Sequence, residues 1–421
     1  MRAVGITCGI GSLLIGARQA GFEVVGNIEW RKYYHARDQH GRNTFTENFR
    51  GAFFREKIDD LTPQEIERAM EVTLAMSHPE CGAYSQLSGS NADFHERRAT
   101  DVSDIPLAVD LIGRLKPRYF AMDDLPKSLM AYPMQKYAEG LPDYDLFPEW
   151  ISNWGYGNVQ RGRNRMFMLG ARRGQGWAFR PGEAEHQGTV ADAIGDLPEP
   201  RRGSNWPNHD PHRMEADCAR ALNMGGYRRK NTWGEVREYF RDKPGGFTME
   251  YPKEDGRVVK RIGFLKGHWE KTSHVLTGGN AIFHNKRCEP YTVRERARIQ
   301  GFPDDFVFYG TILNDRGEWD HDVNRDITVK QTGKAMPIQF ARYFSEQVAA
   351  HVRSRDKFES SGHRVLPPNE HISQAKEWYC SNVGYSDQAA ACSQCWLVRK
   401  CKIRRERFGI HVAGEQTTLP V

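Results

Sequence analysis

Short apolar runs recur through the first 171 residues, and polar or glycine-rich sequence separates each run from the next. A short continuous apolar run is typical of a strand that a parallel sheet buries on both faces. We therefore predict buried parallel strands in this part of the chain. They are Ala3–Ile6, Glu23–Glu29, Val72–Ser77, Tyr119–Asp123 and Met166–Ala171.

Helical patterns lie between these strands. Thr62-Pro63-Gln64-Glu65 has the sequence of a capping box with proline at the first helical position, so a helix is predicted to start there. A second helix is predicted over about Ser103–Lys116. Strands that alternate with helices predict a doubly wound, Rossmann-like α/β domain, whose ligands bind at the carboxyl ends of the strands.

The rest of the chain divides by composition. Residues 172–290 are rich in Gly, Pro, Trp and charge without clear periodicity, and predict a smaller irregular domain inserted after residues 1–171. A compact segment at 291–353 returns to the α/β domain and ends in a helix predicted over Ile338–Arg353. The polar residues 354–371 are predicted to be a linker before a small cysteine-containing module at 372–421.

Composition excludes several classes of protein. Of the 421 residues, 27% are charged and 39% hydrophobic, and the mean hydropathy is −0.70, which fits neither a membrane protein nor a disordered chain. The formal net charge of +6 permits a polyanionic partner without requiring one. Gly9 and Gly11 interrupt the apolar N-terminal run where a secretion signal would be a continuous helix, so we expect a cytoplasmic protein.

Two segments near strand ends could carry chemistry. Glycines in the segment Ile6–Ser12 would let the backbone approach a ligand, and Glu29 at the tip of the next strand could accept hydrogen bonds from ribose hydroxyls. A tight turn with a surface glutamate would look the same. Cys81 follows the third strand, where a thiolate could be a nucleophile, although a lone cysteine is more often a small core residue.

Taken together, these segments and several others resemble the motifs of the cytosine-C5 DNA methyltransferase family. The motifs occur in the family's order from residue 2 to about residue 350. Cys81 falls on the cysteine of the family's Pro-Pro-Cys-Gln loop. The segment Phe120–Leu125 falls on its Glu-Asn-Val block. Further matches, in chain order, are the donor-binding loop at Ile6–Ser12, the Gln-x-Arg-x-Arg block at Arg163-Asn164-Arg165, the ninth block at Tyr291–Asp304 and the tenth block at Gln331–Pro337.

The resemblance implies covalent catalysis on a cytosine flipped out of double-stranded DNA. The Cys81 thiolate would add to C6 and make C5 nucleophilic. Asp123, in the place of the family's Glu, would bond N3 and the exocyclic amine, while Arg163 and Arg165 would help to hold the base and its backbone. We expect a monomer encoded by a bacterium or a phage.

The same resemblance implies a donor of the S-adenosyl-L-methionine type. Its expected contacts are Thr7, Gly9, Gly11, Ser12, Glu29, Trp30, Asp59, Asp60 and Lys334. Several residues depart from the family pattern: Thr7 replaces Phe, Gly82 replaces Gln, and Gln160 is one residue out of register. These changes would suit an inactive DNA-binding relative, or an active enzyme with altered substrate demands, which we favour.

Lys334 stands where the family's tenth block has Asn. An ammonium facing a sulfonium at roughly 5 Å, with an effective dielectric near 20, costs about 3 kcal/mol. A carboxylate on the transferred carbon, as in carboxy-S-adenosyl-L-methionine, would turn this repulsion into attraction and give 5-carboxymethylcytosine. Alternatively, Lys334 extends to solvent or pairs with Glu29 or Asp59, leaving an ordinary methyltransferase.

The inserted segment occupies the family's target-recognition position, and its length favours DNA over tRNA as substrate. Basic and aromatic side chains there could contact phosphates and bases, or be ordinary surface and core. Near the C-terminus, four cysteines at ligand spacing predict a metal site, with zinc as the plain interpretation and a [4Fe-4S] cluster as its rival. These cysteines are Cys380, Cys392, Cys395 and Cys401.

Overall fold

The computed structural model describes residues 1–38, 40–70, 72–80, 104–125, 128, 132–182, 188–201, 205–209, 233–252, 256–278, 281–310, 312–313, 319–320, 327–336 and 338–360. The predicted nucleophile Cys81 and the four C-terminal cysteines lie outside these residues. The chain divides into two compact units. The first contains Met1–Ala69, Ile151–Asn164 and Pro181–Ala349, and the second contains Met70–Trp150, Arg165–Arg180 and Ala350–Val421.

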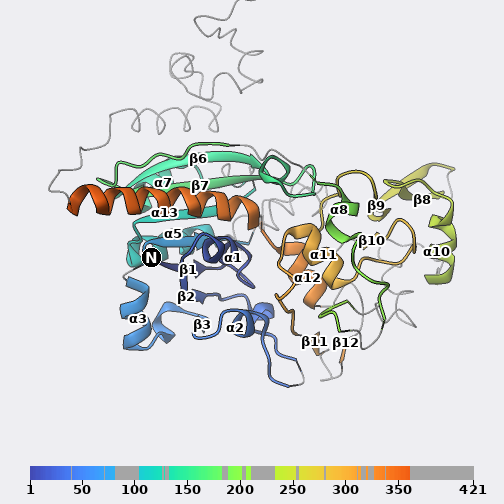
Figure 1. Ribbon diagram of the computed structural model, residues 1–421, viewed down its shortest axis with the longest axis horizontal. Helices are drawn as coiled ribbons and strands as arrows, with labels where there is room; N and C mark the ends of the chain where they lie inside the picture. The colour runs from blue at the N-terminus through green and yellow to red at the C-terminus, as the bar shows by residue number, and fades with distance from the viewer. Residues whose placement is uncertain are drawn as a thin grey trace, which may run out of the picture. The chain divides into compact units, whose positions relative to one another are not determined.

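The first unit holds the N-terminal strands, in the order β3-β2-β1 (Figure 1). β1 (Arg2–Ile6) pairs in parallel with β2 (Glu23–Ile28), and β2 pairs in parallel with β3 (Phe53–Arg55). Helix α1 (Ser12–Gln19) contacts both β1 and β2, and its apolar residues are buried. The predicted strands at β1 and β2 are therefore confirmed, and β3 is an additional edge strand too short to give a sequence pattern.

The capping box predicted at Thr62 is present. The Thr62 backbone N–H donates to Glu65 Oε2 at 2.9 Å, and the Glu65 N–H donates to Thr62 Oγ1 at 3.3 Å. The helix that follows, α3, spans Pro63–Met70. This pair satisfies two backbone donors that the first helical turn leaves without partners.

The second unit holds four strands in the order β4-β5-β7-β6. β4 (Leu74–Ser77) and β5 (Tyr119–Asp124) are parallel, as predicted. β7 (Asn164–Arg172) runs antiparallel to β5, with Ala121 opposite Leu169, so the prediction of a parallel strand at Met166–Ala171 was wrong. Burial on both faces gives the same apolar run in either direction, so the pattern cannot report strand direction.

Helices and one further strand complete this unit and its borders. α5 (Ile105–Leu115) lies within the predicted helix and buries its apolar face, and β6 covers Tyr144–Ser152. Helix α13 runs from Ile338 to Ser360, beyond the predicted end at Arg353. The first part of the predicted linker, 354–360, is therefore helical. The second unit also contains α7 (Met134–Gly140). The remaining short elements belong to the first unit and are η1 (Lys32–His35), α2 (Thr44–Asn48), η2 (Ile58–Asp60) and η5 (Asn153–Tyr156).

The segment 172–290 is more regular than its composition predicts. It contains a three-stranded sheet of order β10-β9-β8, in which β8 (Thr248–Pro252) is antiparallel and β10 (Ala281–Phe283) parallel to β9 (Val258–Lys266). Figure 1 shows helix α10 (Trp233–Arg241) beside β8. The expectation of an irregular segment was wrong, because charged residues such as Glu250, Lys260 and Arg261 interrupt the apolar residues of β8 and β9 and leave no long apolar run.

A buried cluster joins this segment to the ninth block. Val190 and Ile194 of α8 (Val190–Ile194) pack with Leu265, Leu276 and Ile299. Ile299 belongs to α11 (Val293–Gln300), which in turn contacts α12 (Ile327–Lys334). Two short strands, β11 (Ile312–Leu313) and β12 (Trp319–Asp320), pair antiparallel and lie between α11 and α12 in the chain. Among the described residues, no helix is long and apolar enough to cross a membrane.

Candidate active site

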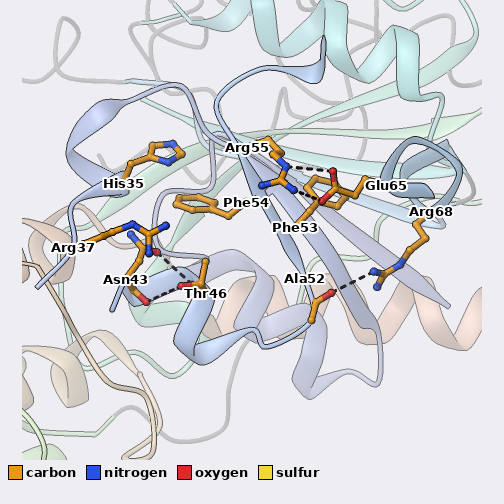
Figure 2. A pocket seen from close by; sticks show the side chains of 11 residues that line it. His35, Arg37, Asn43, Thr46, Ala52, Phe53, Phe54, Arg55, Glu65 and Arg68 are labelled. Atoms are coloured by element: carbon orange, nitrogen blue, oxygen red, sulfur yellow. Dashed lines mark hydrogen bonds and ion pairs between the residues drawn. The ribbon is translucent and has the colours of Figure 1, made fainter. Parts of the chain in front are cut away.

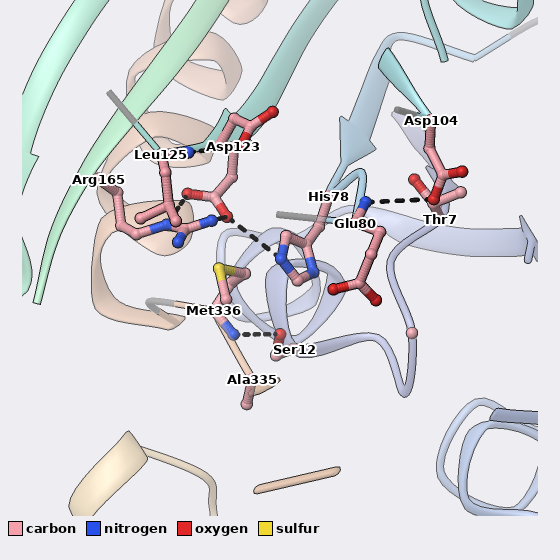
Figure 3. A network of polar contacts seen from close by, with 12 residues as sticks. Thr7, Ser12, His78, Glu80, Asp104, Asp123, Leu125, Arg165, Ala335 and Met336 are labelled. Atoms are coloured by element: carbon pink, nitrogen blue, oxygen red, sulfur yellow. Dashed lines mark hydrogen bonds and ion pairs between the residues drawn. The ribbon is translucent and has the colours of Figure 1, made fainter. Parts of the chain in front are cut away.

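A buried carboxylate lies at the carboxyl end of β5. Asp123 is fully buried. Arg165 donates two hydrogen bonds to its carboxylate, from Nε to Oδ1 at 2.8 Å and from Nη2 to Oδ2 at 2.7 Å (Figure 3). His78 Nε2 lies 3.7 Å from Oδ2. Because β7 is antiparallel, Arg165 near its start comes beside the end of β5. The strand direction that the sequence missed is therefore what brings Asp123 and Arg165 together.

The next residue, Asp124, is a second fully buried carboxyl group. Its Oδ1 accepts a hydrogen bond from the Leu125 N–H at 2.6 Å, while Oδ2 is buried with no hydrogen-bond partner among the described residues. Burial, reinforced by the charge of Asp123 and opposed by that of Arg165, raises the pKa of Asp124 to about 8. Burial thus favours the protonated form of the Asp124 carboxyl at neutral pH.

The residues that precede Cys81 are anchored. The Glu80 N–H donates to Asp104 Oδ2 at 3.2 Å, and Asp104 occupies the N-cap position of α5 (Figure 3). Glu80 and Asp104 border the segment 81–103, so its two ends are tied to each other. The catalytic role of Cys81 remains a prediction.

The loop after β1 has the backbone conformation of a ligand-binding turn. Gly9 and Gly11 have φ of 59° and 89°, and a Cβ atom at Gly9 would lie 2.6 Å from Tyr34 Cζ, so only glycine fits there. Thr7 has φ of 55°, which is uncommon for a β-branched residue and marks strain in this loop. Ser12 Oγ accepts a hydrogen bond from the Met336 N–H at 2.9 Å, which brings the tenth block against the loop.

Glu29, the predicted ribose acceptor, is fully buried and already bonded. Its Oε2 accepts from the Gly9 N–H at 2.7 Å and from Arg31 Nη2 at 2.7 Å. Its Oε1 accepts from the backbone N–H and from Nε of Arg31, at 2.9 and 2.7 Å. Burial alone would lower the pKa of Arg31, but Glu29 raises it well above its usual value, so the guanidinium stays charged.

Lys334 lies at the end of α12, and its Nζ donates to the Tyr33 hydroxyl at 3.2 Å and sits 4.7 Å from the centre of the Tyr33 ring. Tyr33 adjoins Tyr34, the residue packed against Gly9. Lys334 is thus linked through Tyr33 and Tyr34 to the loop after β1. Arg163 is also buried near the tenth block and donates to the carbonyls of Leu276 at 2.7 Å and Ala335 at 2.6 Å.

The remaining predicted donor contacts differ in exposure. Asp59 and Asp60 are exposed on η2, where Asp60 accepts the Lys57 N–H at 3.0 Å. Trp30 is half-buried, and its Nε1 has no partner among the described residues. Nη1 of Arg31 is likewise buried and without one. Unpartnered buried donors beside a glycine loop fit a bound molecule that carries acceptor oxygens or nitrogens.

A cavity of about 340 Å³ opens elsewhere in the first unit, along β3 (Figure 2). Its lining comes from residues 35–68 and includes Arg55 and Glu65, which lie side by side with a hydrogen bond of 2.8 Å from Arg55 Nη2 to Glu65 Oε1. Thr7, Gly9, Gly11 and Ser12 of the donor loop do not line it. This cavity is therefore separate from the loop after β1.

The ninth block is a buried structural element. Arg294 is fully buried, and its guanidinium donates to the carbonyls of Pro207, Pro303 and Phe306 at 3.0, 3.1 and 2.7 Å. Gln160, noted above as out of register, donates from Nε2 to Gln300 Oε1 at 2.6 Å. These buried polar groups join segments that are distant in the sequence.

The fold and the site together define a methyltransferase-type α/β enzyme, and comparison with known proteins specifies the family. The profile of the C-5 cytosine-specific DNA methylases matches residues 1–350, and the chain belongs to this family. Membership supports DNA cytosine-C5 methyltransferase as the enzyme class and S-adenosyl-L-methionine as donor. The predicted family resemblance is confirmed.

Characterised relatives are distant but nearly full length. Type II methyltransferase M.MthTI of Methanothermobacter thermautotrophicus is 25% identical over 81% of this chain and 94% of its own length. Type II methyltransferase M.BbvI of Brevibacillus brevis is 24% identical over 81% of this chain and 88% of its own length. The chain is therefore a divergent member of its family.

Solved structures match the fold. A protein described as a DNA modification methyltransferase from an E. coli prophage superposes with a TM-score of 0.57 at 19% identity, covering 84% of this chain and 99% of that one. A mutant of Spodoptera frugiperda DNMT2 gives 0.51 at 11% identity, covering 83% and 99%. The predicted Rossmann-like α/β fold is confirmed by this likeness.

Three residues of the site were missed by sequence reasoning. Arg31 and His78 adjoin predicted site residues or strands without matching a motif, and Asp124 lies within the segment Phe120–Leu125 but differs in type from the family's Asn. For Arg31 a signal was present: a cation two residues after a buried glutamate at a strand tip can pair with it.

Proposed function

We propose that this protein transfers a one-carbon-linked group to C5 of a cytosine in double-stranded DNA. The observation that carries the proposal is the buried Asp123–Arg165 pair at the carboxyl end of β5, on the unit that also carries Glu80, the residue before Cys81. A buried fork of this kind fixes a carboxylate in one orientation, as recognition of a base edge requires.

In the proposed reaction the Cys81 thiolate adds to C6, and the electron pair of the C5–C6 double bond moves toward N3. An arginine fork engages one lone pair on each oxygen of a carboxylate, which leaves a second position free on each oxygen. In the proposed complex one Asp123 oxygen accepts from the exocyclic amine. The other oxygen carries a proton taken up from solvent and donates it to N3 as the negative charge develops there. C5 then bonds the transferred carbon, whose bond to the sulfonium sulfur breaks with its electron pair. Loss of the C5 proton to a base expels the thiolate and restores the ring.

When bound, the donor would supply the group to be transferred, through an electrophilic carbon attached to its sulfonium sulfur. The residues proposed to hold it are Gly9, Gly11, Ser12 and Trp30, together with Asp59 and Asp60. The backbone of Gly9 and Gly11 can approach a ligand closely. The hydrogen bond from the Met336 N–H holds the Ser12 hydroxyl in place.

The test is trapping on duplex DNA that contains 5-fluorocytosine, which has no C5 proton to lose. With donor present, the protein should form an adduct that survives denaturant, and Cys81→Ser should abolish it. Cys288→Ser is the matched control, because Cys288 is a buried free cysteine of the first unit and should leave the adduct intact. Absence of an adduct on varied DNA with each donor would favour a catalytically silent DNA-binding protein instead.

A second candidate concerns the group transferred. The contacts of Lys334 with Tyr33 keep an ammonium close to the donor loop. We therefore propose carboxymethyl transfer from carboxy-S-adenosyl-L-methionine beside methyl transfer from S-adenosyl-L-methionine. Mass analysis of digested DNA after incubation with each donor separates the two products. Methylcytosine as the sole product, unchanged in Lys334→Asn and in the control Lys330→Asn on the same helix, would exclude the carboxymethyl alternative.

Two further assignments belong to this proposal. Residues 172–290 supply target recognition, with basic side chains of this segment contacting phosphates. Cys380, Cys392, Cys395 and Cys401 bind a structural metal, either zinc or a [4Fe-4S] cluster, in a basic module that contacts DNA.

A further inference from the structure

The bonding of Glu29 conflicts with its expected role as a ribose acceptor. A carboxylate offers about four lone-pair positions. The Gly9 N–H and three N–H groups of Arg31 fill all four, at 2.7 to 2.9 Å. A ribose hydroxyl could therefore donate to Glu29 only by displacing one of these donors inside a buried site.

Arg31 has the complementary property, because one end of its guanidinium lacks a partner. Nε and Nη2 bond Glu29, Nη2 also donates to the Thr7 carbonyl, and the guanidinium carbon lies 4.8 Å from the centre of the Tyr34 ring. Only Nη1 is left, and it is buried without a hydrogen-bond partner among the described residues. A buried N–H of a charged group that makes no bond is costly, so this position fits a ligand acceptor.

The location of this N–H selects the ligand atom. Tips of second strands in doubly wound folds face the ribose of bound nucleotides, and Glu29 is at that tip. Arg31 is held between Glu29 and the Thr7 carbonyl, at the base of the glycine loop. The group presented to a ribose is therefore a donor from Arg31 where an acceptor was expected.

We propose that Arg31 binds the donor molecule by donating from Nη1 to a ribose oxygen, and that Glu29 is a positioning residue that orients Arg31. This inference rests on the proposed function, since it requires a donor of the adenosylmethionine type. It reverses the polarity of the expected contact: the ribose oxygen accepts a hydrogen bond, and the protein supplies a charged donor.

The experiment measures binding of S-adenosylhomocysteine and of its 2′-deoxy and 3′-deoxy analogues by calorimetry, without DNA. Arg31→Lys keeps the charge beside Glu29 but removes the planar fork. For wild type, one deoxy analogue should bind about 10- to 100-fold more weakly than the parent, as expected for a charged hydrogen bond. In Arg31→Lys the parent should weaken by a similar factor, and the deoxy penalty should disappear.

Arg42→Lys is the matched control, because Arg42 also pairs with an acid, Asp38, and stacks on a tyrosine, Tyr309, at an exposed site. It should retain both the affinity and the deoxy penalty. A full deoxy penalty in Arg31→Lys would overturn the inference, because Arg31 would then be structural. The inference is also wrong if Arg31→Lys instead loses the preference for S-adenosylhomocysteine over 5′-methylthioadenosine, since that loss places Arg31 on the amino-acid carboxylate.

Failure of the proposed function gives a different result. If wild type binds neither S-adenosylhomocysteine nor any of its analogues while remaining folded, the donor class is wrong, and the inference about Arg31 falls with it. If wild type binds the parent compound, only the comparison between the deoxy analogues and the Arg31 variant decides the inference.

Discussion

In a buried ion pair such as Asp123–Arg165, each charged group needs the other, although the pair as a whole adds little to the free energy of unfolding. Removing one member leaves the other charged and buried, which typically costs about 3–5 kcal/mol. We expect Arg165→Met to lower the free energy of unfolding by this amount in urea titrations, and to abolish the covalent adduct. The double variant Asp123→Asn/Arg165→Met should regain most of the lost stability. A single variant within about 1 kcal/mol of wild type would contradict this.

Asp124 makes stability depend on pH. Its pKa rises from the usual 3.8 to about 8 on folding, so between these values the folded chain holds a proton that the unfolded chain releases. The unfolding free energy should therefore fall as pH rises from about 4 to about 8, by up to about 1.4 kcal/mol per pH unit. Asp124→Asn should remove this contribution and be more stable than wild type at pH 8.

The control for this comparison is Asp143→Asn, which changes an exposed carboxylate of the same unit. Its stability should follow the wild-type pH profile. Urea unfolding at pH 5, 6, 7 and 8 measures all three proteins. Parallel profiles for wild type and Asp124→Asn would show that the Asp124 carboxyl is not the titrating group.

Single residues also show where sequence reasoning stops. Asp123 and Glu29 were predicted as site residues from their motif positions and lie at or just after the ends of β5 and β2, and Lys334 lies at the end of α12. The bonding of these residues was not predictable, because Arg165 reaches Asp123 only through an antiparallel strand, and Arg31 takes up the acceptor positions of Glu29. A motif specifies where a side chain stands but not which neighbour is already bonded to it.

At the scale of elements, the cap of α11 carries a prediction. The Glu295 N–H donates to Thr292 Oγ1 at 3.2 Å, the Thr292 N–H donates to Glu295 Oε2 at 2.8 Å, and the same hydroxyl lies 2.9 Å from His209 Nδ1. Thr292→Ala should lower the unfolding free energy by about 1–2 kcal/mol, at the upper end for a cap because the site is buried. Thr292→Ser keeps the hydroxyl and should lose less. Equal losses in urea titrations would mean that the methyl group matters and the cap does not.

Strands could be predicted where both of their faces are buried, and helices could be predicted where the sequence contains a capping box. β1, β2, β4, β5 and α3 have continuous apolar runs or a capping box, and the sequence locates them. β3 is an edge of three residues, and β8 and β9 mix charged with apolar positions, so neither gives an apolar run. Direction was lost for β7, because hydrophobicity does not distinguish parallel from antiparallel pairing.

For the molecule as a whole, we predict that the C-terminal cysteine module can unfold without affecting ligand binding elsewhere in the chain. If the metal is structural, Cys395→Ser should unfold residues 378–408 and release the metal, while binding of S-adenosylhomocysteine to the first unit is unchanged. Proteolysis and metal analysis of wild type and variant measure this. A brown anaerobic preparation indicates an iron-sulfur cluster, and a colourless one with stoichiometric zinc indicates a zinc site. A module that stays folded after complete metal removal would contradict both.

The bond between the Met336 N–H and Ser12 Oγ joins residues 324 positions apart. During translation at about 5–20 residues per second, the donor loop leaves the ribosome on the order of 20–60 s before the segment that fixes it. The nascent chain thus cannot complete its donor site until most of the polypeptide has been made. Binding of a ligand that needs this loop in its fixed form should therefore begin only once the chain has been made past residue 336.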